Sequence, residues 1–144
     1  MSQVAEPGVP VSRGWKHFRV EFTGERDSQN TPGEKVLAFN LICQTEPEVG
    51  QVVFIPASLQ SHALMTLKAL YSACGYKPGA EGHDPKNIDG GELYGKVEWE
   101  DYDPNTKKGK AISNTQTEVA EGHQIRSKIA PWNFKSMREG ANLR

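Results

Sequence analysis

The amino-acid sequence predicts a mainly β fold with one α-helix. Several short stretches carry apolar residues at every second position, as strands do, and one stretch carries them at three- and four-residue intervals, as a helix does. The elements follow one another as three strands, one helix and two strands, without an internal repeat. A meander, a helix and a closing hairpin form the element order of a five-stranded OB barrel, which is the fold that we expect.

The chain has 144 residues, which is enough for one domain with extensions. We expect a flexible arm at 1–12, an OB-fold domain at 13–117 and a basic C-terminal tail at 118–144. The arm is rich in proline and glycine and poor in large apolar residues. In the tail the hydrophobic pattern fades, and the large apolar residues stand isolated in polar sequence: Ile125, Ile129, Trp132 and Phe134.

The first three strands are expected at about 14–23, 35–45 and 51–55, with a long polar turn at 24–34 between the first two. The first strand has an inner face of Phe18, Val20 and Phe22 and an opposite face of Trp15, His17, Arg19 and Glu21. The second strand has one face of Leu37, Phe39, Leu41 and Cys43. The third strand is short and apolar on both sides, so we expect other elements to cover it on both faces.

The helix is expected where apolar residues form a single stripe: Ala63, Leu64, Leu67, Leu70, Tyr71 and Cys74. Ser58 or Ser61 can cap its start, and Gly75 can cap its end. A connection rich in glycine, aspartate and proline follows at 76–91.

The fourth strand, at about 92–102, alternates strictly. Leu93, Val97 and Trp99 form its core face, and the polar or amphipathic side chains form its solvent face: Tyr94, Lys96, Glu98, Glu100 and Tyr102. A turn with three lysines leads to the fifth strand, at about 110–116.

Charge is distributed unevenly, although the formal net charge is only −1. Residues 1–104 hold 9 Lys/Arg and 15 Asp/Glu, a net of −6, whereas residues 105–144 hold 8 and 3, a net of +5. A basic terminal segment on an acidic body indicates contact with a polyanion on one side, and a solvated tail is the alternative.

The two cysteines and the N-terminus favour a cytoplasmic location. Cys43 and Cys74 fall in apolar patterns without metal-ligand spacing, so we expect free buried thiols in a reducing compartment. The first ten residues lack the basic start and apolar core of a signal peptide. No run approaches the roughly 20 apolar residues of a membrane span.

None of the common catalytic or metal-binding motifs is present. Asp101, Asp103 and Asn105 have the spacing of a calcium loop, but Thr106 replaces the required glycine and Ile112 the required glutamate. The four histidines lack metal-ligand spacing, and there is no GxSxG elbow or GK[ST] phosphate loop. We therefore expect no metal, no cofactor and no enzymatic activity.

Aromatic and basic residues outside the core pattern are the candidates for nucleic-acid contacts. In an OB barrel the ligand contacts strands two and three and the turns that here span 24–34 and 103–110. Exposed rings stack on bases, and cations contact phosphates. The candidates are Trp15, Arg19, Tyr94, Lys96, Tyr102, Lys107, Lys108, Lys110 and Trp132. The alternatives are rings packed under other elements and lysines solvated at a hairpin tip.

The chain also resembles a group of small phage-encoded proteins, long labelled as of unknown function, that are regarded as OB-fold single-stranded DNA-binding proteins. The resemblance spans roughly residues 14–135. It rests on GWKHF at 14–18, VVFIP at 52–56, LYSACG at 70–75, ELYGKV at 92–97 and a polar return around Asn114. It implies a role in DNA replication or recombination, partners among the proteins of those processes and a location in the host bacterial cytoplasm.

These observations favour a non-catalytic protein that binds single-stranded DNA in phage-like replication or recombination. A second hypothesis is a protein-interaction module or inhibitor that binds a replication or host-defence protein through its barrel and basic tail. In that case the charge asymmetry also suits self-association into a homo-oligomer. A third hypothesis is a metal-dependent hydrolase that uses carboxylates and His83.

Overall fold

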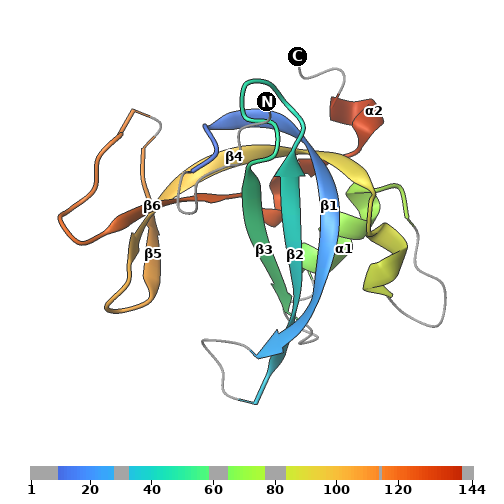
Figure 1. Ribbon diagram of the computed structural model, residues 1–144, viewed down its shortest axis with the longest axis horizontal. Coiled ribbons are helices and arrows are strands. Elements are labelled where there is room, and N and C mark those ends of the chain that lie inside the picture. Colours follow the sequence, from blue (N-terminus) through green and yellow to red (C-terminus); the bar gives the residue numbers. More distant parts are fainter. Residues whose placement is uncertain (1–9, 28–32, 59–64, 77–83, 114, 141–144) are drawn as a thin grey trace.

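The computed structural model describes residues 10–27, 33–58, 65–76, 84–113 and 115–140. It is mainly β, with an antiparallel sheet and two short α-helices (Figure 1). The strands are β1 (Gly14–Asp27), β2 (Lys35–Cys43), β3 (Val52–Ser58), β4 (Glu92–Asp103), β5 (Lys108–Ala111), β6 (Gln124–Lys128) and β7 (Phe134–Lys135). The helices are α1 (Met65–Ala73) and α2 (Met137–Gly140), with 3-10 helices η2 (Pro85–Ile88) and η3 (Pro131–Asn133).

The strands are ordered β3-β2-β1-β4-β5, and β4 is paired along both of its edges. Near its start β4 pairs with β1 and β7, and near its end it pairs with β5 and β6. In Figure 1 this long strand arches from the β1–β3 part of the sheet to the β5 and β6 strands. Within the described residues no ladder joins β3 to β6 or β7, so the expected closed barrel is not formed.

The inner faces of β1 and β2 form the core as the alternation predicts. Phe18 and Val20 are buried, whereas Arg19 and Glu21 between and beyond them are exposed. The β2 residues expected on one face are all buried: Leu37, Phe39, Leu41 and Cys43. The predicted inner faces of these two strands are therefore confirmed, because side-chain direction in a strand follows from the local pleat.

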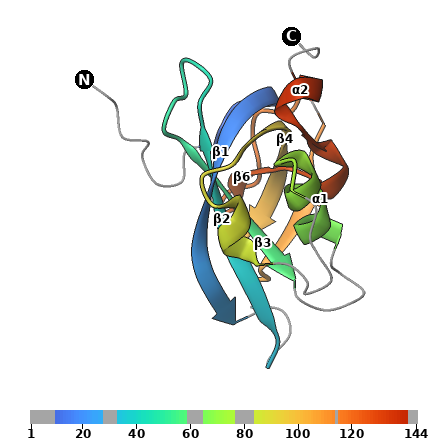
Figure 2. The ribbon, with the colours of Figure 1, turned by 90° about the vertical axis from the view of Figure 1, so that its right-hand side faces the viewer.

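Helix α1 covers the open side of the sheet between β3 and β7, and Figure 2 shows it on the side opposite β1. Three of its four buried residues, Leu67, Leu70 and Tyr71, belong to the predicted stripe, and the fourth is Ala73. Gly75 adopts a φ of 77°, and the Tyr76 amide donates to the Tyr71 carbonyl at 2.9 Å, which is the capping geometry expected of a C-terminal glycine. Of the two expected N-cap residues, Ser58 is the last residue of β3, seven positions before α1, and Ser61 lies outside the described residues, as does the first part of the stripe.

Strand β3 is covered on one face only, so the expectation of two covered faces is wrong. Val53 and Ile55 are buried, but Val52 is 44% and Phe54 39% exposed. The reason is position: β3 is the edge strand, and no described element packs on the outer side of β2 and β3. Pro56 within the strand was the available signal, because proline is confined to edge strands and bulges.

The packed structure extends into both segments expected to be loose. Val11, placed in the flexible arm, is fully buried. The range expected to be a basic tail contains β6, β7, η3 and α2, and Ile129 and Phe134 are buried in the core. The apolar residues that fill the space beside β4 do not repeat at the intervals of a helix or a strand. The hydrophobic pattern of the sequence therefore could not identify them as core residues. The fifth strand is also shorter than expected, at Lys108–Ala111.

No helix in the described ranges is long and apolar enough to cross a membrane.

Candidate nucleic-acid interface

The candidate interface is the outer face, which we define as the side of β1–β4 that points away from α1. Two cross-strand rows run over it, from Arg19 through Ile42 to Val52 and from Glu21 through Asn40 to Phe54. These side chains share a face because directly paired residues of antiparallel strands lie side by side. Two rows of mixed polar and apolar groups are thus left open to solvent.

Phe54 and Arg26 form an exposed aromatic–cation pair on this face. The Arg26 guanidinium carbon lies 5.6 Å from the centroid of the Phe54 ring. A register shift between Phe22 and Gly24 reverses the parity of β1, so that Arg26 falls on the same face as Arg19. Neither residue was among the sequence candidates. Gly24 inside the strand was the signal for the bulge, as Pro56 was for the exposed β3 face.

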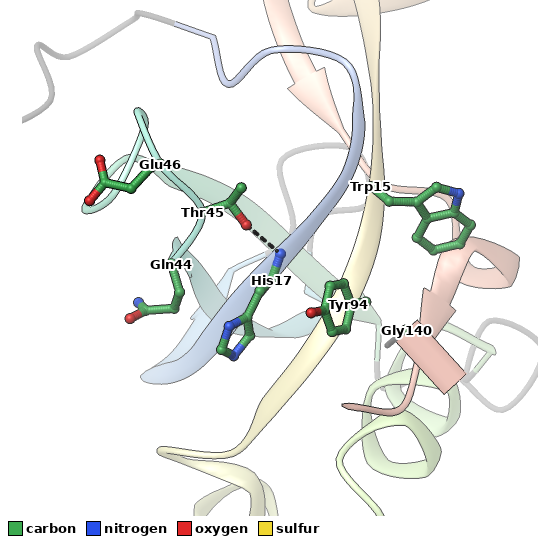
Figure 3. Close-up of a pocket in the computed structure, with 7 residues that line it drawn as sticks. All are labelled: Trp15, His17, Gln44, Thr45, Glu46, Tyr94 and Gly140. Atoms are coloured by element: carbon green, nitrogen blue, oxygen red, sulfur yellow. Dashed lines mark hydrogen bonds between the residues drawn. The ribbon is translucent and has the colours of Figure 1, made fainter. Parts of the chain in front are cut away.

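A pocket of about 470 Å³ lies at the beginning of β1 on the same face (Figure 3). Its walls are Trp15, His17, Gln44, Thr45, Glu46, Tyr94 and Gly140. The segment after β2 is held against β1, because the His17 amide donates to Thr45 Oγ1 at 2.9 Å and the Gln44 amide donates to the His17 carbonyl at 2.7 Å. The pocket therefore joins four segments that are distant in sequence.

Tyr94 lines this pocket but is only 4% exposed, so the expectation of a solvent-exposed ring is wrong. The strand face of Tyr94 was predicted correctly, because its side chain points to the opposite side of β4 from that of Leu93. Helix α2 covers it: a Cβ placed on Gly140 would lie 1.9 Å from Tyr94 Cδ2. On its other side the ring stacks on His17, with centroids 5.5 Å apart, and His17 Nε2 lies 2.8 Å from a Glu92 carboxylate oxygen.

The structure brings four of the nine candidates to the outer face: Trp15, Arg19, Tyr94 and Lys96. Trp15 is half-buried in the pocket wall and pairs with the exposed Lys96 across the β1–β4 ladder. Arg19 is exposed further along β1. Carboxylates are interspersed with these cations, including Glu21 beside Asn40. The face is therefore mixed in charge rather than strongly basic.

Four other candidates gather on the β4–β5 hairpin. Lys107, Lys108 and Lys110 are exposed, and Lys107 adopts a φ of 58° in the turn. Tyr102 is half-buried and carries the Arg126 guanidinium 4.2 Å from its ring centroid, so one side of the ring is already occupied. The hairpin is thus a basic surface separate from the pocket.

The turn of this hairpin has the geometry of an Asx turn, because Asp103 Oδ1 accepts from the Asn105 amide at 2.9 Å. Among the described residues no group of three His, Cys, Asp or Glu side chains is arranged to hold a metal ion. His83, named for the hydrolase hypothesis, lies outside the described residues.

The remaining tryptophans behave differently from each other. Trp132 is 71% exposed on η3, which contacts α1, so it lies apart from the pocket and the hairpin. Trp99 packs against the core as predicted, and its indole donates to the Val11 carbonyl at 2.8 Å. Arg13 lies 4.3 Å above the Trp99 ring and donates to the carbonyls of Ser113 and Gln116, which ties the β5–β6 connection to the N-terminal segment.

The N-terminal segment is also held by a half-buried carboxylate. Glu48 accepts from the Ser12 amide at 2.7 Å and from the Ser12 hydroxyl, and Lys16 Nζ lies 3.4 Å away. Burial by itself would raise the pKa of Glu48, but these hydrogen bonds and the Lys16 charge outweigh it and lower the pKa below its usual value.

The chain matches no protein-family model, and a search of curated proteins finds no match to it. The resemblance to phage-encoded proteins therefore stays a prediction from the sequence.

Proposed function

We propose that this protein binds single-stranded DNA without catalysis, in phage-like replication or recombination, and that the strand lies across the outer face. The observation that carries the proposal is the exposed Phe54 ring at the β3 end of one of the two solvent-facing rows, with Arg19 and Arg26 on the same face. A stacking ring with cations beside it is what a single strand requires. The replication or recombination setting comes from the sequence resemblance.

We further propose that the sheet is an OB-type barrel left open between β3 and β6. The order β3-β2-β1-β4 with α1 between β3 and β4 supports this assignment, and β6 takes the place of the fifth strand instead of the expected 110–116. On this assignment the β4–β5 hairpin belongs to the long connection between the last two barrel strands, which is one of the ligand-binding loops of the fold.

The salt dependence of binding distinguishes a DNA path that covers only the outer face from one that also reaches the β4–β5 hairpin. Arg19, Arg26 and Lys96 on the outer face would give a slope of about −2 in log affinity against log salt, at about 0.7 for each phosphate contact of a single strand. Contacts by the three hairpin lysines as well would take the slope to about −4.

The test is fluorescence anisotropy with labelled oligo-dT and a duplex control over a salt series. We expect oligo-dT to bind more tightly than the duplex. Phe54→Ala should weaken oligo-dT binding by about 5- to 150-fold, the equivalent of 1–3 kcal/mol for one stacked base. Met65→Ala is the matched control, because Met65 is 63% exposed on α1, across the sheet from the outer face. Absence of binding to either nucleic acid at about 50 mM salt would refute the proposal.

A protein-interaction module remains the second candidate because of one observation. Trp132 exposes most of its indole on η3 beside α1, away from the outer face, and exposed tryptophans are frequent anchors of protein interfaces. Sedimentation over a range of concentrations and salts tests self-association through this surface. A monomer of unchanged mass under all conditions, together with DNA binding, would reject the homo-oligomer form of this candidate.

A further inference from the structure

Helix α2 lies against the outer face and covers the ring of Tyr94. The Tyr94 side chain shares this face with its two cross-strand partners, His17 on β1 and Lys135 on β7. Figure 3 shows Gly140 beside the ring. A Cβ placed on Gly140 would lie 1.9 Å from Tyr94 Cδ2 and 2.2 Å from Cγ, so that only glycine fits at this position. The backbone of Gly140 therefore occupies space in which another group could contact the ring.

The contact between α2 and the sheet is small. The helix has four residues, of which Gly140 is buried, whereas Met137, Arg138 and Glu139 are exposed. A helix this short is not stable by itself in water. Glycine has no side chain to bury, so little apolar area holds α2 on the sheet.

The turn of α2 is held together by its own hydrogen bonds. Ser136 and Glu139 form a capping box, in which the Glu139 amide donates to Ser136 Oγ at 3.2 Å and the Ser136 amide donates to Glu139 Oε1 at 3.3 Å. These bonds do not involve Tyr94. Strand β7 ends at Lys135, immediately before the turn. A change of backbone conformation at Ser136 is therefore enough to move α2 off the ring while β7 stays paired with β4.

Cations and a second aromatic side chain surround the covered ring. Lys135 lies directly opposite Tyr94, and Lys96 lies two residues further along β4 on the same face, at roughly 7 Å by strand geometry. Trp15 is the cross-strand neighbour of Lys96. Both Tyr94 and Gly140 line the pocket at the start of β1, so a strand that fills this pocket meets the edge of the α2 contact. Without α2, the ring and its cations have the composition of a stacking site for a single strand.

We propose that α2 is a lid over a second base-stacking site, and that the bound strand displaces Gly140 and stacks one base on Tyr94. The free protein is then mostly closed, and its apparent affinity for DNA is lowered by the fraction of molecules that are open. An open state populated at about 10% lowers the affinity about 10-fold. This inference rests on the proposed single-strand binding and adds to it a contact that is covered in the free protein.

Gly140→Ala tests the lid, because the added methyl group has no space against Tyr94. The ring cannot simply retreat, since His17 stacks on it with the ring centroids 5.5 Å apart. We expect the variant to bind oligo-dT about 10-fold more tightly than the wild type in anisotropy titrations. In a Tyr94→Leu background the same change should leave the affinity unchanged, because the opened site then lacks the ring. Arg138→Lys is the matched control, since Arg138 is exposed on α2 and lysine keeps its charge.

Trypsin cleavage after Arg138, followed by mass spectrometry, measures the release of α2 independently of affinity, because proteolysis follows the population of the open form. We expect faster cleavage in Gly140→Ala, and also in the wild type when oligo-dT is bound. Ser136→Ala should act in the same direction, because it breaks the capping box without touching Tyr94. Thermal unfolding of each variant shows that the rest of the chain stays folded.

The outcomes separate the lid from the proposed function. Cleavage of the wild type that oligo-dT does not accelerate overturns the lid and leaves the proposed function standing, as does a Gly140→Ala variant that is cleaved faster but binds no more tightly. A gain in affinity that persists in the Tyr94→Leu background overturns Tyr94 as the stacking site. Absence of binding to oligo-dT by the wild type and the variants overturns the proposed function, and the lid with it. Faster cleavage on DNA binding, together with a gain in affinity that requires Tyr94, supports the inference.

Discussion

Replacing Ile129 by alanine tests whether the C-terminal segment is part of the folded core. Ile129 is 6% exposed, and its side chain packs over Gly95 and toward Phe18: a Cβ placed on Gly95 would lie 2.8 Å from Ile129 Cδ1 and 3.5 Å from Phe18. Alanine removes three carbons, each worth about 0.8 kcal/mol of burial, or about 2.4 kcal/mol together.

The cavity left behind raises this cost. Gly95 is paired to Lys16 on one edge of β4 and to Phe134 on the other, so its backbone has little freedom to move into the space. Residual cavity volume adds to the transfer term, and we expect a total loss of about 3–4 kcal/mol in the free energy of unfolding. That is a large fraction of the 5–15 kcal/mol typical of a domain.

Urea unfolding of the wild type and of Ile129→Ala measures this difference. Ile125→Ala is the matched control: Ile125 lies in β6, four residues earlier in the same segment, and is only half-buried. We expect the control to lose clearly less stability than Ile129→Ala. A loss below about 0.5 kcal/mol for Ile129→Ala would mean that the segment behaves as a tail, and would refute the packing described here.

Two further predictions concern charge. Changing Lys107, Lys108 and Lys110 together to alanine should reduce the salt slope of single-strand binding by up to about 2, at about 0.7 for each lost phosphate contact. Thermal unfolding should stay unchanged, because all three side chains are exposed. An unchanged slope would exclude the hairpin from the DNA path. Glu48 has a folded pKa below its usual value of 4.5, so its contribution to stability is present above that pH and is lost as the pH falls through the folded pKa. Ser12→Ala should therefore destabilise the protein at neutral pH and do so much less at pH near 3 in parallel urea titrations, whereas a pH-independent difference would show that the hydroxyl acts only by packing.

The strand faces were predictable from the sequence because side-chain direction is local. Phe18 and Val20 point inward and Arg19 points outward in the structure as in the alternating pattern. The glycine cap of α1 was also predictable. The residue that follows a helix often has a left-handed backbone conformation, which glycine adopts easily because it has no Cβ. The same logic assigned Tyr94 to the face opposite Leu93, which is correct.

What covers each face was decided only by the tertiary structure. Phe54 is open because β3 became the edge of the sheet, and Tyr94 is covered because α2, more than 40 residues later in the chain, packs Gly140 against its ring. The pocket likewise exists only where β1, β4, α2 and the segment after β2 meet. The period of the hydrophobic pattern shows the direction of a side chain relative to its own backbone. Burial depends instead on which segments, distant in sequence, pack against that side chain. For this protein the sequence determined the first four strands and the direction of most of their side chains, and the tertiary packing determined which of those faces a ligand can reach.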